Sequence, residues 1–147
     1  MNILIMNKFN IETYTNSNSE IELYLTEAIT NYGMDQLKGN KPVKLYSCLK
    51  SGKEEYIGAV MGSITNNMLF ISHLFVEKSN RNNGLGKILL STIENLAVAS
   101  GCNLIRLNTF NKKAHSFYID AGYDETVCIE HYMNGFDLVY YHKNIKE

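Results

Sequence analysis

Apolar and polar residues follow a strand pattern in three consecutive segments joined by short turns. Residues 43–49, "VKLYSCL", alternate in polarity, and residues 56–64 and 68–76 continue the strand pattern. The connections "KSGKE" and "TNN" are only a few residues long. Short connections join neighbouring antiparallel strands, so the pattern predicts a three-stranded meander.

Three further segments place apolar residues at helical spacing. Residues 18–37 predict one or two short helices, with Ser19 as a possible cap and an interruption at Gly33. Residues 84–100 carry one apolar stripe and predict a longer helix. Residues 114–121 repeat the spacing i, i+3, i+4, i+7 and predict a second helix in this half of the chain.

The remaining segments complete a mixed sheet. Residues 1–10 predict a first strand, residues 103–110 a strand between two helices, and residues 123–132 and 136–145 a closing hairpin around an Asn-Gly turn. The order is therefore strand, helices, three strands, helix, strand, helix, two strands. It predicts one α/β (α+β) domain over residues 1–147, with about six to seven strands and helices on both faces of the sheet.

The composition of the chain indicates which classes of binding partner are not expected. The 147 residues carry 14 basic and 15 acidic side chains, and the longest basic run is Lys112–Lys113. Nucleic acids and anionic membranes recruit basic patches, so neither is an expected partner. No apolar run approaches the ~20 residues of a membrane span. The three cysteines form no CxxC pair, so we expect no metal site and a cytoplasmic location.

Candidate chemistry begins at "NRNNGLGKIL", residues 80–89. A strand that ends at Val76 or Glu77 leads into a loop that opens a helix at Gly84, where unpaired backbone N–H groups and the helix dipole favour an anion. Arg81 is one of only two arginines in the chain; it offers forked donors to phosphate oxygens, and Lys87 adds charge. The stretch predicts a phosphate site, and a plain turn without a ligand is the alternative.

Single residues exclude two common phosphate-binding loops. A P-loop requires Ser or Thr after Gly86-Lys87, where this chain has Ile88. The dinucleotide fingerprint requires a third glycine where this chain has Leu89. It also requires an acidic residue ~20 positions further on, where this chain has Arg106. The predicted phosphate therefore belongs to another cofactor.

Two motifs occur in a fixed order along the chain. "LFVEKSNRNNGLGKILL" places Arg-x-x-Gly-x-Gly after a strand that ends in apolar-x-Val. "NKKAHSFYIDAGY" then carries Asn-x-x-Ala-x-x-x-Tyr-x-x-x-Gly-Tyr, matched at Asn111, Ala114, Tyr118, Gly122 and Tyr123. Together they resemble the Gcn5-related N-acetyltransferase (GNAT) family. The resemblance covers essentially residues 1–145, is strongest over residues 68–124, and implies the GNAT fold, with two strands splayed to admit acetyl-CoA.

The resemblance implies a site for acetyl-CoA (coenzyme A). The strand backbone before the loop would pair with the pantetheine amides like an added strand, which requires the next strand to splay away. The loop would hold the pyrophosphate, and Asn111 would help to orient the cofactor. The implied cofactor-binding residues are Leu74, Phe75, Val76, Arg81, Asn82, Asn83, Gly84, Leu85, Gly86, Lys87, Asn111 and Tyr118.

The resemblance also implies a catalytic role for Tyr118, as the general acid that protonates the leaving thiolate. A phenol suits this role because it stays protonated at neutral pH and can still donate. The alternative is that Tyr118 is only a core aromatic of an amphipathic helix.

The general base is left open. Many relatives carry an acid on the strand before the loop, but the usual places here hold Phe70 and Ser72. Alternation places His73 on the opposite face of its strand from Ser72 and Leu74. The remaining candidates are His73, Glu130, His131 and a relayed water.

The implied activity is transfer of acetyl from acetyl-CoA to a primary amine by direct attack in a ternary complex. The acceptor site is expected between residues 19–37 and 123–143. The hairpin there carries a polar-aromatic set suited to a small-molecule amine, or to a dimer interface: Glu130, His131, Tyr132, Asp137, Tyr140 and Tyr141. A protein N-terminus or lysine is the alternative acceptor, a non-catalytic acetyl-CoA-binding module is the alternative of another class, and a homodimer is left open.

Overall fold

The computed structural model describes residues 5–6 and 9–145, and the chain divides into two compact units, residues 1–39 and residues 40–147. In the first unit, β1 (Ile5–Met6) and β2 (Phe9–Asn10) pair antiparallel and precede α1 (Ser19–Leu37). The strand predicted over residues 1–10 lies partly outside the described residues. A single domain over the whole chain stays a prediction.

α1 is one continuous helix of 19 residues, so the interruption predicted at Gly33 is wrong. An interior glycine costs a helix only about 1 kcal/mol, which a helix of this length tolerates. The helix begins after Asn18, whose side-chain oxygen accepts a hydrogen bond from the backbone N–H of Ile21 at 3.2 Å. The cap is therefore Asn18 and not Ser19, because only a side chain one position earlier reaches that donor.

The second unit is built on a six-stranded mixed sheet in the order β3–β4–β5–β6–β8–β7. The β5–β6 pair is parallel and the other pairs are antiparallel. The strands are β3 (Val43–Lys50), β4 (Tyr56–Thr65), β5 (Met68–Val76), β6 (Leu104–Thr109), β7 (Asp124–Met133) and β8 (Phe136–Asn144). The predicted fold class, the meander and the closing hairpin are confirmed.

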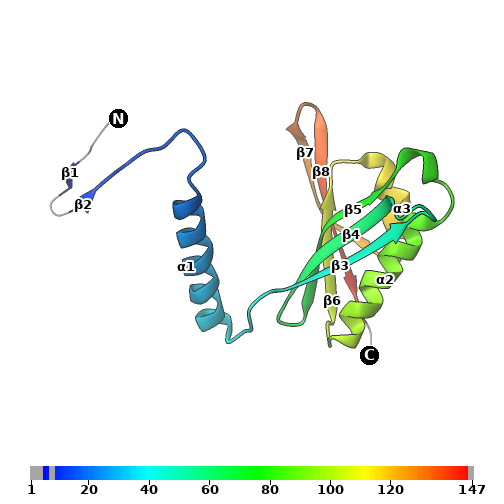
Figure 1. The fold of residues 1–147 in the computed structure, drawn as a ribbon, viewed down its shortest axis with the longest axis horizontal. Helices are drawn as coiled ribbons and strands as arrows, with labels where there is room; N and C mark the ends of the chain where they lie inside the picture. The colour runs from blue at the N-terminus through cyan, green and yellow to red at the C-terminus, as the bar shows by residue number, and fades with distance from the viewer. Residues whose placement is uncertain (1–4, 7–8, 146–147) are drawn as a thin grey trace. The chain divides into compact units, whose positions relative to one another are not determined.

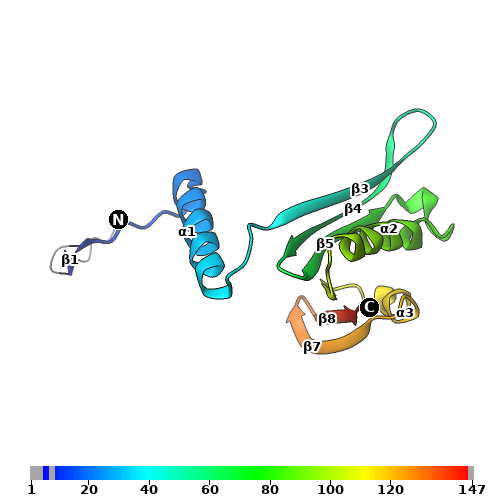
Figure 2. The same ribbon diagram turned by 90° about the horizontal axis from the view of Figure 1, so that it is seen from below.

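Two helices and two short 3₁₀ turns connect these strands, namely η1 (Lys78–Asn80), α2 (Leu85–Ala99), η2 (Lys112–Ala114) and α3 (His115–Asp120). α2 runs along β3, β4 and β5, and both α2 and α3 contribute to one buried core with the sheet (Figures 1 and 2). From α2 the fully buried side chains are Leu89, Leu90, Ile93 and Ala97. The apolar stripe of residues 84–100 therefore faces the sheet, as its spacing predicts.

A β-bulge interrupts the pairing of β4 with β5. Met61 pairs with His73 and Gly62 pairs with Ile71, so Ser72 is the extra residue on β5. The Ser72 hydroxyl donates a hydrogen bond to the carbonyl oxygen of Met61 at 3.2 Å. The side-chain bond holds the bulge at this position, and a bulge re-aims the side chains that follow it.

The bulge depends on a glycine in the opposite strand. A Cβ at Gly62 would lie 2.7 Å from the carbonyl oxygen of Phe70, closer than real Cβ contacts come. Beyond the bulge, Leu74 and Val76 pack against the core while His73 is exposed. His73 therefore lies on the opposite face from Leu74, as predicted. Its predicted placement opposite Ser72 is wrong, because the bulge breaks the alternation and brings Ser72 Oγ to 3.0 Å from His73 Nδ1.

β5 and β6 diverge after a short parallel ladder. The pairing joins Met68–Ile71 to Leu104–Leu107, and within the described part of the chain Ser72–Val76 has no partner on β6. β6 continues beside β8 as far as Thr109. The sheet therefore opens into a V, whose arms are β3–β4–β5 and β6–β8–β7 (Figure 2). The predicted splay of two strands is confirmed.

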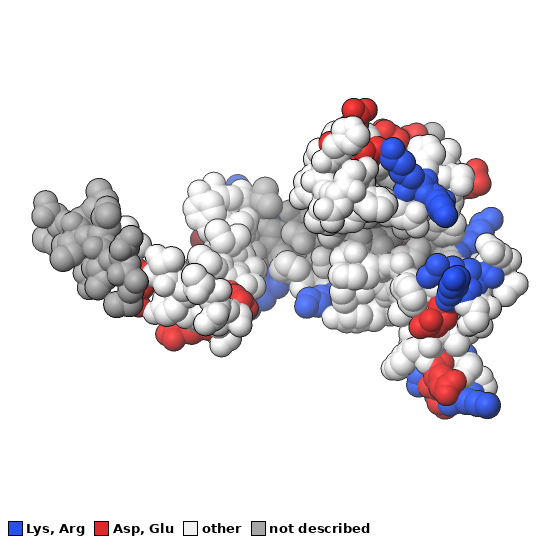
Figure 3. All heavy atoms as spheres, turned by 90° about the horizontal axis from the view of Figure 1, so that it is seen from above, with Lys and Arg blue, Asp and Glu red and all other residues white. Residues whose placement is uncertain are grey.

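The surface of the second unit mixes both signs of charge. On the face drawn in Figure 3, basic and acidic side chains lie next to one another and do not gather into a field of one sign. A mixed surface of this kind does not steer a long polyanion toward that face. Among the described residues, no helix is long and apolar enough to cross a membrane.

Candidate active site

A cavity of about 470 Å³, the central cavity, lies at the V beside the β5–α2 loop and α3. Ten of the twelve cofactor residues implied by the sequence line it: Leu74, Phe75, Val76, Arg81, Asn82, Gly84, Gly86, Lys87, Asn111 and Tyr118. They come from β5, the loop, α2, the β6–η2 turn and α3. The fold therefore brings together residues that are up to 44 positions apart in sequence, from 74 to 118.

The loop before α2 is shaped by two residues with positive φ. Asn82 has φ 64° and Gly84 has φ 75°, both in the left-handed region that Asn and Gly tolerate. α2 begins at Leu85 and has no side-chain cap. The first backbone N–H groups of a helix have no intrahelical acceptor, so those of α2 are free to bind an anion in the central cavity.

Arg81 is held over the end of β5. Its Nε donates a hydrogen bond to the carbonyl oxygen of Val76 at 2.8 Å, and its guanidinium carbon lies 5.4 Å from the centre of the Phe75 ring. These contacts leave the other guanidinium N–H groups for a ligand. Together with Lys87 on the first turn of α2, Arg81 gives this end of the cavity a positive charge.

Asn111 caps η2 and lines the cavity at once. Its side-chain oxygen accepts a hydrogen bond from the backbone N–H of Lys113 at 3.0 Å, so its amide NH₂ is left to donate to a ligand. The two implied cofactor residues that do not line the cavity are Asn83 and Leu85. Asn83 approaches the carbonyl oxygen of Asn80 at 3.5 Å instead.

Tyr118 is both a core residue and a wall of the central cavity. Its side chain is 8% exposed, and its ring centre lies 5.1 Å from that of Phe117, 5.9 Å from Tyr123 and 5.4 Å from Tyr141. Burial raises the pKa of the Tyr118 phenol above its ordinary value, and the neighbouring Tyr141 raises it further. The phenol is therefore protonated at neutral pH and able to donate into the cavity.

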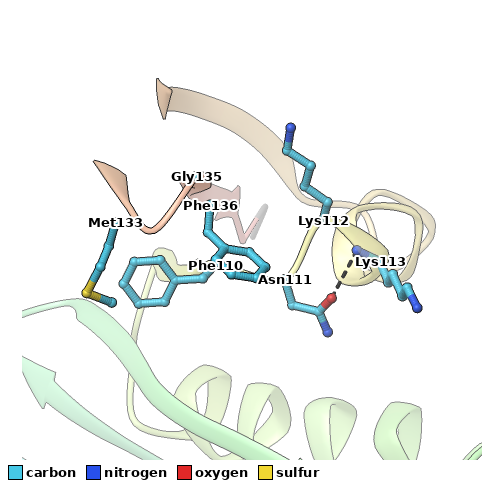
Figure 4. Close-up of a pocket in the computed structure, with 7 residues that line it drawn as sticks. All are labelled: Phe110, Asn111, Lys112, Lys113, Met133, Gly135 and Phe136. Atoms are coloured by element: carbon cyan, nitrogen blue, oxygen red, sulfur yellow. Dashed lines mark hydrogen bonds between the residues drawn. The ribbon is translucent and has the colours of Figure 1, made fainter. Parts of the chain in front are cut away.

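A second cavity of about 560 Å³, the hairpin cavity, lies between the end of β6 and the β7–β8 turn (Figure 4). It is lined by Phe110, Asn111, Lys112, Lys113, Met133, Gly135 and Phe136. Phe110, Met133 and Phe136 make most of its wall apolar, and Asn111 also lines the central cavity. The two cavities therefore adjoin at Asn111.

A third cavity of about 440 Å³, the meander cavity, lies on the other arm of the V. It is lined by Tyr46, Ser47, Cys48, Tyr56, Ala59, Val60, Met61, His73 and Phe75. Phe75 also lines the central cavity. The central cavity is thus flanked on each arm of the V by a cavity that shares one residue with it.

The sequence model of the acetyltransferase (GNAT) family matches residues 7–123. The chain belongs to this family. It is an acyltransferase that uses acetyl-CoA as its cosubstrate. A search of curated proteins finds no match.

Solved acetyltransferases share the fold of this GNAT chain. A chain assigned as an acetyltransferase from Agrobacterium tumefaciens has 19% identity and a TM-score of 0.87, with 93% of this chain and 100% of that one covered. An acetyltransferase from Bacillus cereus has 26% identity and a TM-score of 0.78, with 91% and 98% covered. A chain assigned as a streptothricin acetyltransferase from Bacillus anthracis, solved with acetyl coenzyme A, has 22% identity, a TM-score of 0.63, and 73% and 65% covered.

The central cavity of this GNAT enzyme fits acetyl-CoA on chemical grounds. Backbone N–H groups at the start of α2, with Arg81 and Lys87, suit a pyrophosphate. The unpaired stretch Ser72–Val76 offers backbone donors and acceptors to the amides of an extended arm. Asn111 and Tyr118 offer further donors on the opposite wall.

Sequence reasoning missed two residues of the central cavity, Ala114 and Phe117. A Cβ at Gly86 would lie 3.5 Å from the Phe117 ring, so Phe117 packs directly over the first turn of α2. The helical spacing of residues 114–121 was the available signal, because it places these two side chains on the same face as Tyr118.

The polar-aromatic set predicted on the hairpin does not form one surface. Tyr141 is buried in the core at 2% exposure, and the Tyr132 ring lies 5.7 Å from that of Phe110. Asp137 accepts hydrogen bonds from the Lys112 ammonium at 2.6 Å and from the backbone N–H of His131 at 3.0 Å. The hairpin instead presents Met133 and Phe136 to its cavity.

Proposed function

We propose that this acetyltransferase transfers acetyl to the primary amine of a small molecule, by direct attack of the amine in a ternary complex. The observation that carries the proposal is the arrangement of the three cavities. The hairpin and meander cavities each adjoin the central cavity through one shared residue, Asn111 or Phe75. An amine held in either one can reach a cofactor bound at the V, so both substrates can be bound together.

The positions of the cysteines support direct attack. Of the described residues that line the central cavity, none is a cysteine. Cys102 is buried, and burial raises the pKa of its thiol. Cys48 lines the meander cavity and Cys128 lies on β7. An acyl-enzyme on sulfur would require a thiolate beside the thioester, and the central cavity offers none.

The proposed chemistry assigns one task to each wall of the central cavity. Bound acetyl-CoA supplies a thioester carbonyl carbon, which the amine attacks. Arg81, Lys87 and the start of α2 hold the phosphates, and the backbone of Leu74–Val76 aligns the pantetheine arm. Tyr118 gives its phenol proton to the sulfur as the carbon–sulfur bond breaks.

Both flanking cavities support a small molecule as the acceptor. Their volumes, about 560 Å³ for the hairpin cavity and about 440 Å³ for the meander cavity, are within the range of about 300–1,000 Å³ of small-molecule sites, and mostly apolar walls with a few polar groups are typical of them. The fold alone does not choose the acceptor. One similar structure is assigned as a streptothricin acetyltransferase, and another is the ribosomal-protein-S18-alanine N-acetyltransferase from Escherichia coli.

The test is an acetylation panel read by release of free thiol. It compares small aliphatic and aromatic amines, aminoglycoside- and streptothricin-type amines, and peptides with a free N-terminus or a lysine. We expect kcat/KM to be highest for a small amine. Faster turnover of the peptides would replace the small molecule with a protein acceptor. Binding of acetyl-CoA and desulfo-CoA by calorimetry, with no thiol released from any amine, would contradict the transfer itself.

A further inference from the structure

We infer that His73 is the general base of the proposed transfer and that Ser72 fixes the tautomer in which it acts. The inference rests on the proposed function, because a base is required only if an amine is acetylated. It follows from the bulge in β5, which places both side chains on the exposed part of the strand beside the V. Family resemblance gives no guide here, since Phe70 and Ser72 occupy the places where relatives carry an acid.

Two groups lie within hydrogen-bonding distance of the Ser72 hydroxyl, the carbonyl oxygen of Met61 at 3.2 Å and His73 Nδ1 at 3.0 Å. The carbonyl oxygen can only accept, so we assign the single hydroxyl proton to it. In the contact with His73 the Ser72 oxygen then accepts, and Nδ1 carries the hydrogen. In the neutral ring Nε2 is then the nitrogen with a free lone pair, which is the form that a general base requires.

His73 is also in the right place. It lies two residues beyond Ile71, the last residue of β5 that pairs with β6, which is about 7 Å along the strand. It lines the meander cavity, while its neighbour Leu74 lines the central cavity with Tyr118. The base and the acid therefore approach the V from opposite faces of β5, which fits an amine held in the meander cavity and a thiol that leaves on the side of Tyr118.

The charged groups nearest the meander cavity lie at its rim: the Lys50 ammonium is 5.3 Å from the centre of the Tyr56 ring, and the Arg81 guanidinium is 5.4 Å from that of Phe75. The titratable groups that share the meander cavity are Tyr46 and Cys48 from β3 and Tyr56 from β4, two phenols and a thiol. No charged side chain is among the described residues that line this cavity. In the register of the sheet, the first residue of β6 beyond the parallel ladder is the neutral Asn108.

The two other candidate bases are less well placed. Glu130 and His131 are exposed on β7, and neither is among the residues that line the three cavities around the V. The backbone N–H of His131 donates a hydrogen bond to Asp137, and His131 has φ 51°. Glu130 and His131 therefore both lie in the irregular part of β7, where its register with β8 shifts between Ile129 and Met133.

The proton transfers balance over one turnover. As the amine nitrogen bonds to the acetyl carbon and the carbon–sulfur bond breaks, His73 Nε2 accepts the proton that the nitrogen loses. Tyr118 gives its phenol proton to the sulfur. His73 then releases a proton to water and Tyr118 regains one from water. The products are the N-acetyl amine and free thiol, and both residues return to their starting states.

The first experiment compares His73→Gln with the wild type in steady-state kinetics over a range of pH. Glutamine fits an exposed strand position but cannot take up a proton. We expect kcat to fall about 10²-fold, with the amine KM and the calorimetric acetyl-CoA affinity changed less than about twofold. The acidic limb of the kcat/KM profile should lose one ionisation. His142→Gln, a change of another sheet histidine bonded to Thr126 on β7, is the matched control and should keep wild-type turnover.

The second experiment tests Ser72 without turnover. In the wild type, imidazole ¹⁵N shifts of neutral His73 should show hydrogen on Nδ1 and a bare Nε2. Ser72→Ala should shift the ring toward hydrogen on Nε2 and lower kcat several-fold. Ser72→Thr keeps the hydroxyl and should restore both the tautomer and the rate.

Each outcome decides one part of the inference. Wild-type activity and an unchanged pH profile in His73→Gln would exclude His73 as the base. Hydrogen on Nε2 in the wild type would exclude the role of Ser72. If the wild type is active and one of these two results is found, only the inference about His73 and Ser72 is overturned. If the wild type acetylates no amine, the proposed function is overturned.

Discussion

Tyr118 shows at the residue scale why a motif match and a packing pattern can both be correct. Its ring packs among three other aromatic rings, which explains its apolar spacing along α3. Tyr118 also lines the central cavity. In the proposed mechanism the ring packs and the hydroxyl donates a proton, so a substitution can remove one without the other.

Tyr118→Phe removes only the hydroxyl. We expect kcat to fall about 10²-fold, because a general acid contributes about that much, while the acetyl-CoA affinity changes less than about twofold. Thiol-release kinetics and calorimetry measure the two quantities. Tyr123→Phe is the matched control, because Tyr123 does not line the central cavity and its hydroxyl donates a hydrogen bond to Glu94 at 2.8 Å. This variant should have a lower Tm and an unchanged kcat. Full activity in Tyr118→Phe would remove Tyr118 from the mechanism.

The bulge in β5 is the feature at the element scale on which the site depends. It needs Ser72 as the extra residue and Gly62 in the opposite strand. The pairing of β5 with β6 also ends at this level, after Ile71. One irregularity therefore sets which face His73 occupies and where the V begins.

Gly62→Ala should disrupt the bulge, because the new methyl group would meet the Phe70 carbonyl oxygen at 2.7 Å. We expect a loss of about 1–3 kcal/mol in the free energy of unfolding, measured by urea denaturation. Gly52→Ala is the control, since a Cβ there has no atom within 4 Å and should change stability little. Equal stability of the two variants would show that the bulge tolerates a side chain at this position.

Asp137 anchors the β7–β8 hairpin to η2 in a pH-dependent way. The bond from Lys112, and then the N–H of His131, hold the pKa of Asp137 below its ordinary value. Because the pKa of Asp137 is lower in the folded than in the unfolded protein, its ionised form stabilises the fold. The full contribution is present at a pH above the unfolded-state pKa of about 3.9, and it is lost as the pH falls through the folded-state pKa. Asp137→Asn should therefore lower Tm at pH 6, and the difference should shrink near about pH 3. A pH-independent difference would contradict the ion pair.

The sequence predicted elements and their order better than their details. Periodicity was sufficient for the meander, for α2 and for the hairpin, because each buries one regular face. It failed at Gly33, because a glycine can remain in a long helix, and at the cap, where Asn18 and Ser19 are both good candidates. The bulge could not be predicted, because an extra residue at Ser72 leaves no trace in the polarity pattern.

At the scale of the whole molecule, acetyl-CoA should stabilise the fold by mass action. A ligand at about 100 times its Kd adds about 2.7 kcal/mol, which raises Tm by several degrees in a chain of this size. Thermal scans at increasing acetyl-CoA measure the effect. Pantetheine is the control, because it cannot use Arg81 or Lys87 and should act only at much higher concentration. A Tm that does not move with acetyl-CoA would contradict binding at the V.

The V has a consequence for handling the protein. Ser72–Val76 is in effect a strand edge inside the sheet, and free strand edges are templates for aggregation. Acetyl-CoA bound along β5 would cover that edge, so the cosubstrate should also act as a solubility factor. Light scattering during storage at 37 °C should show slower aggregation with acetyl-CoA than without it. Coenzyme A should protect as well, because the thioester itself does not contact the edge; if neither protects, aggregation begins elsewhere.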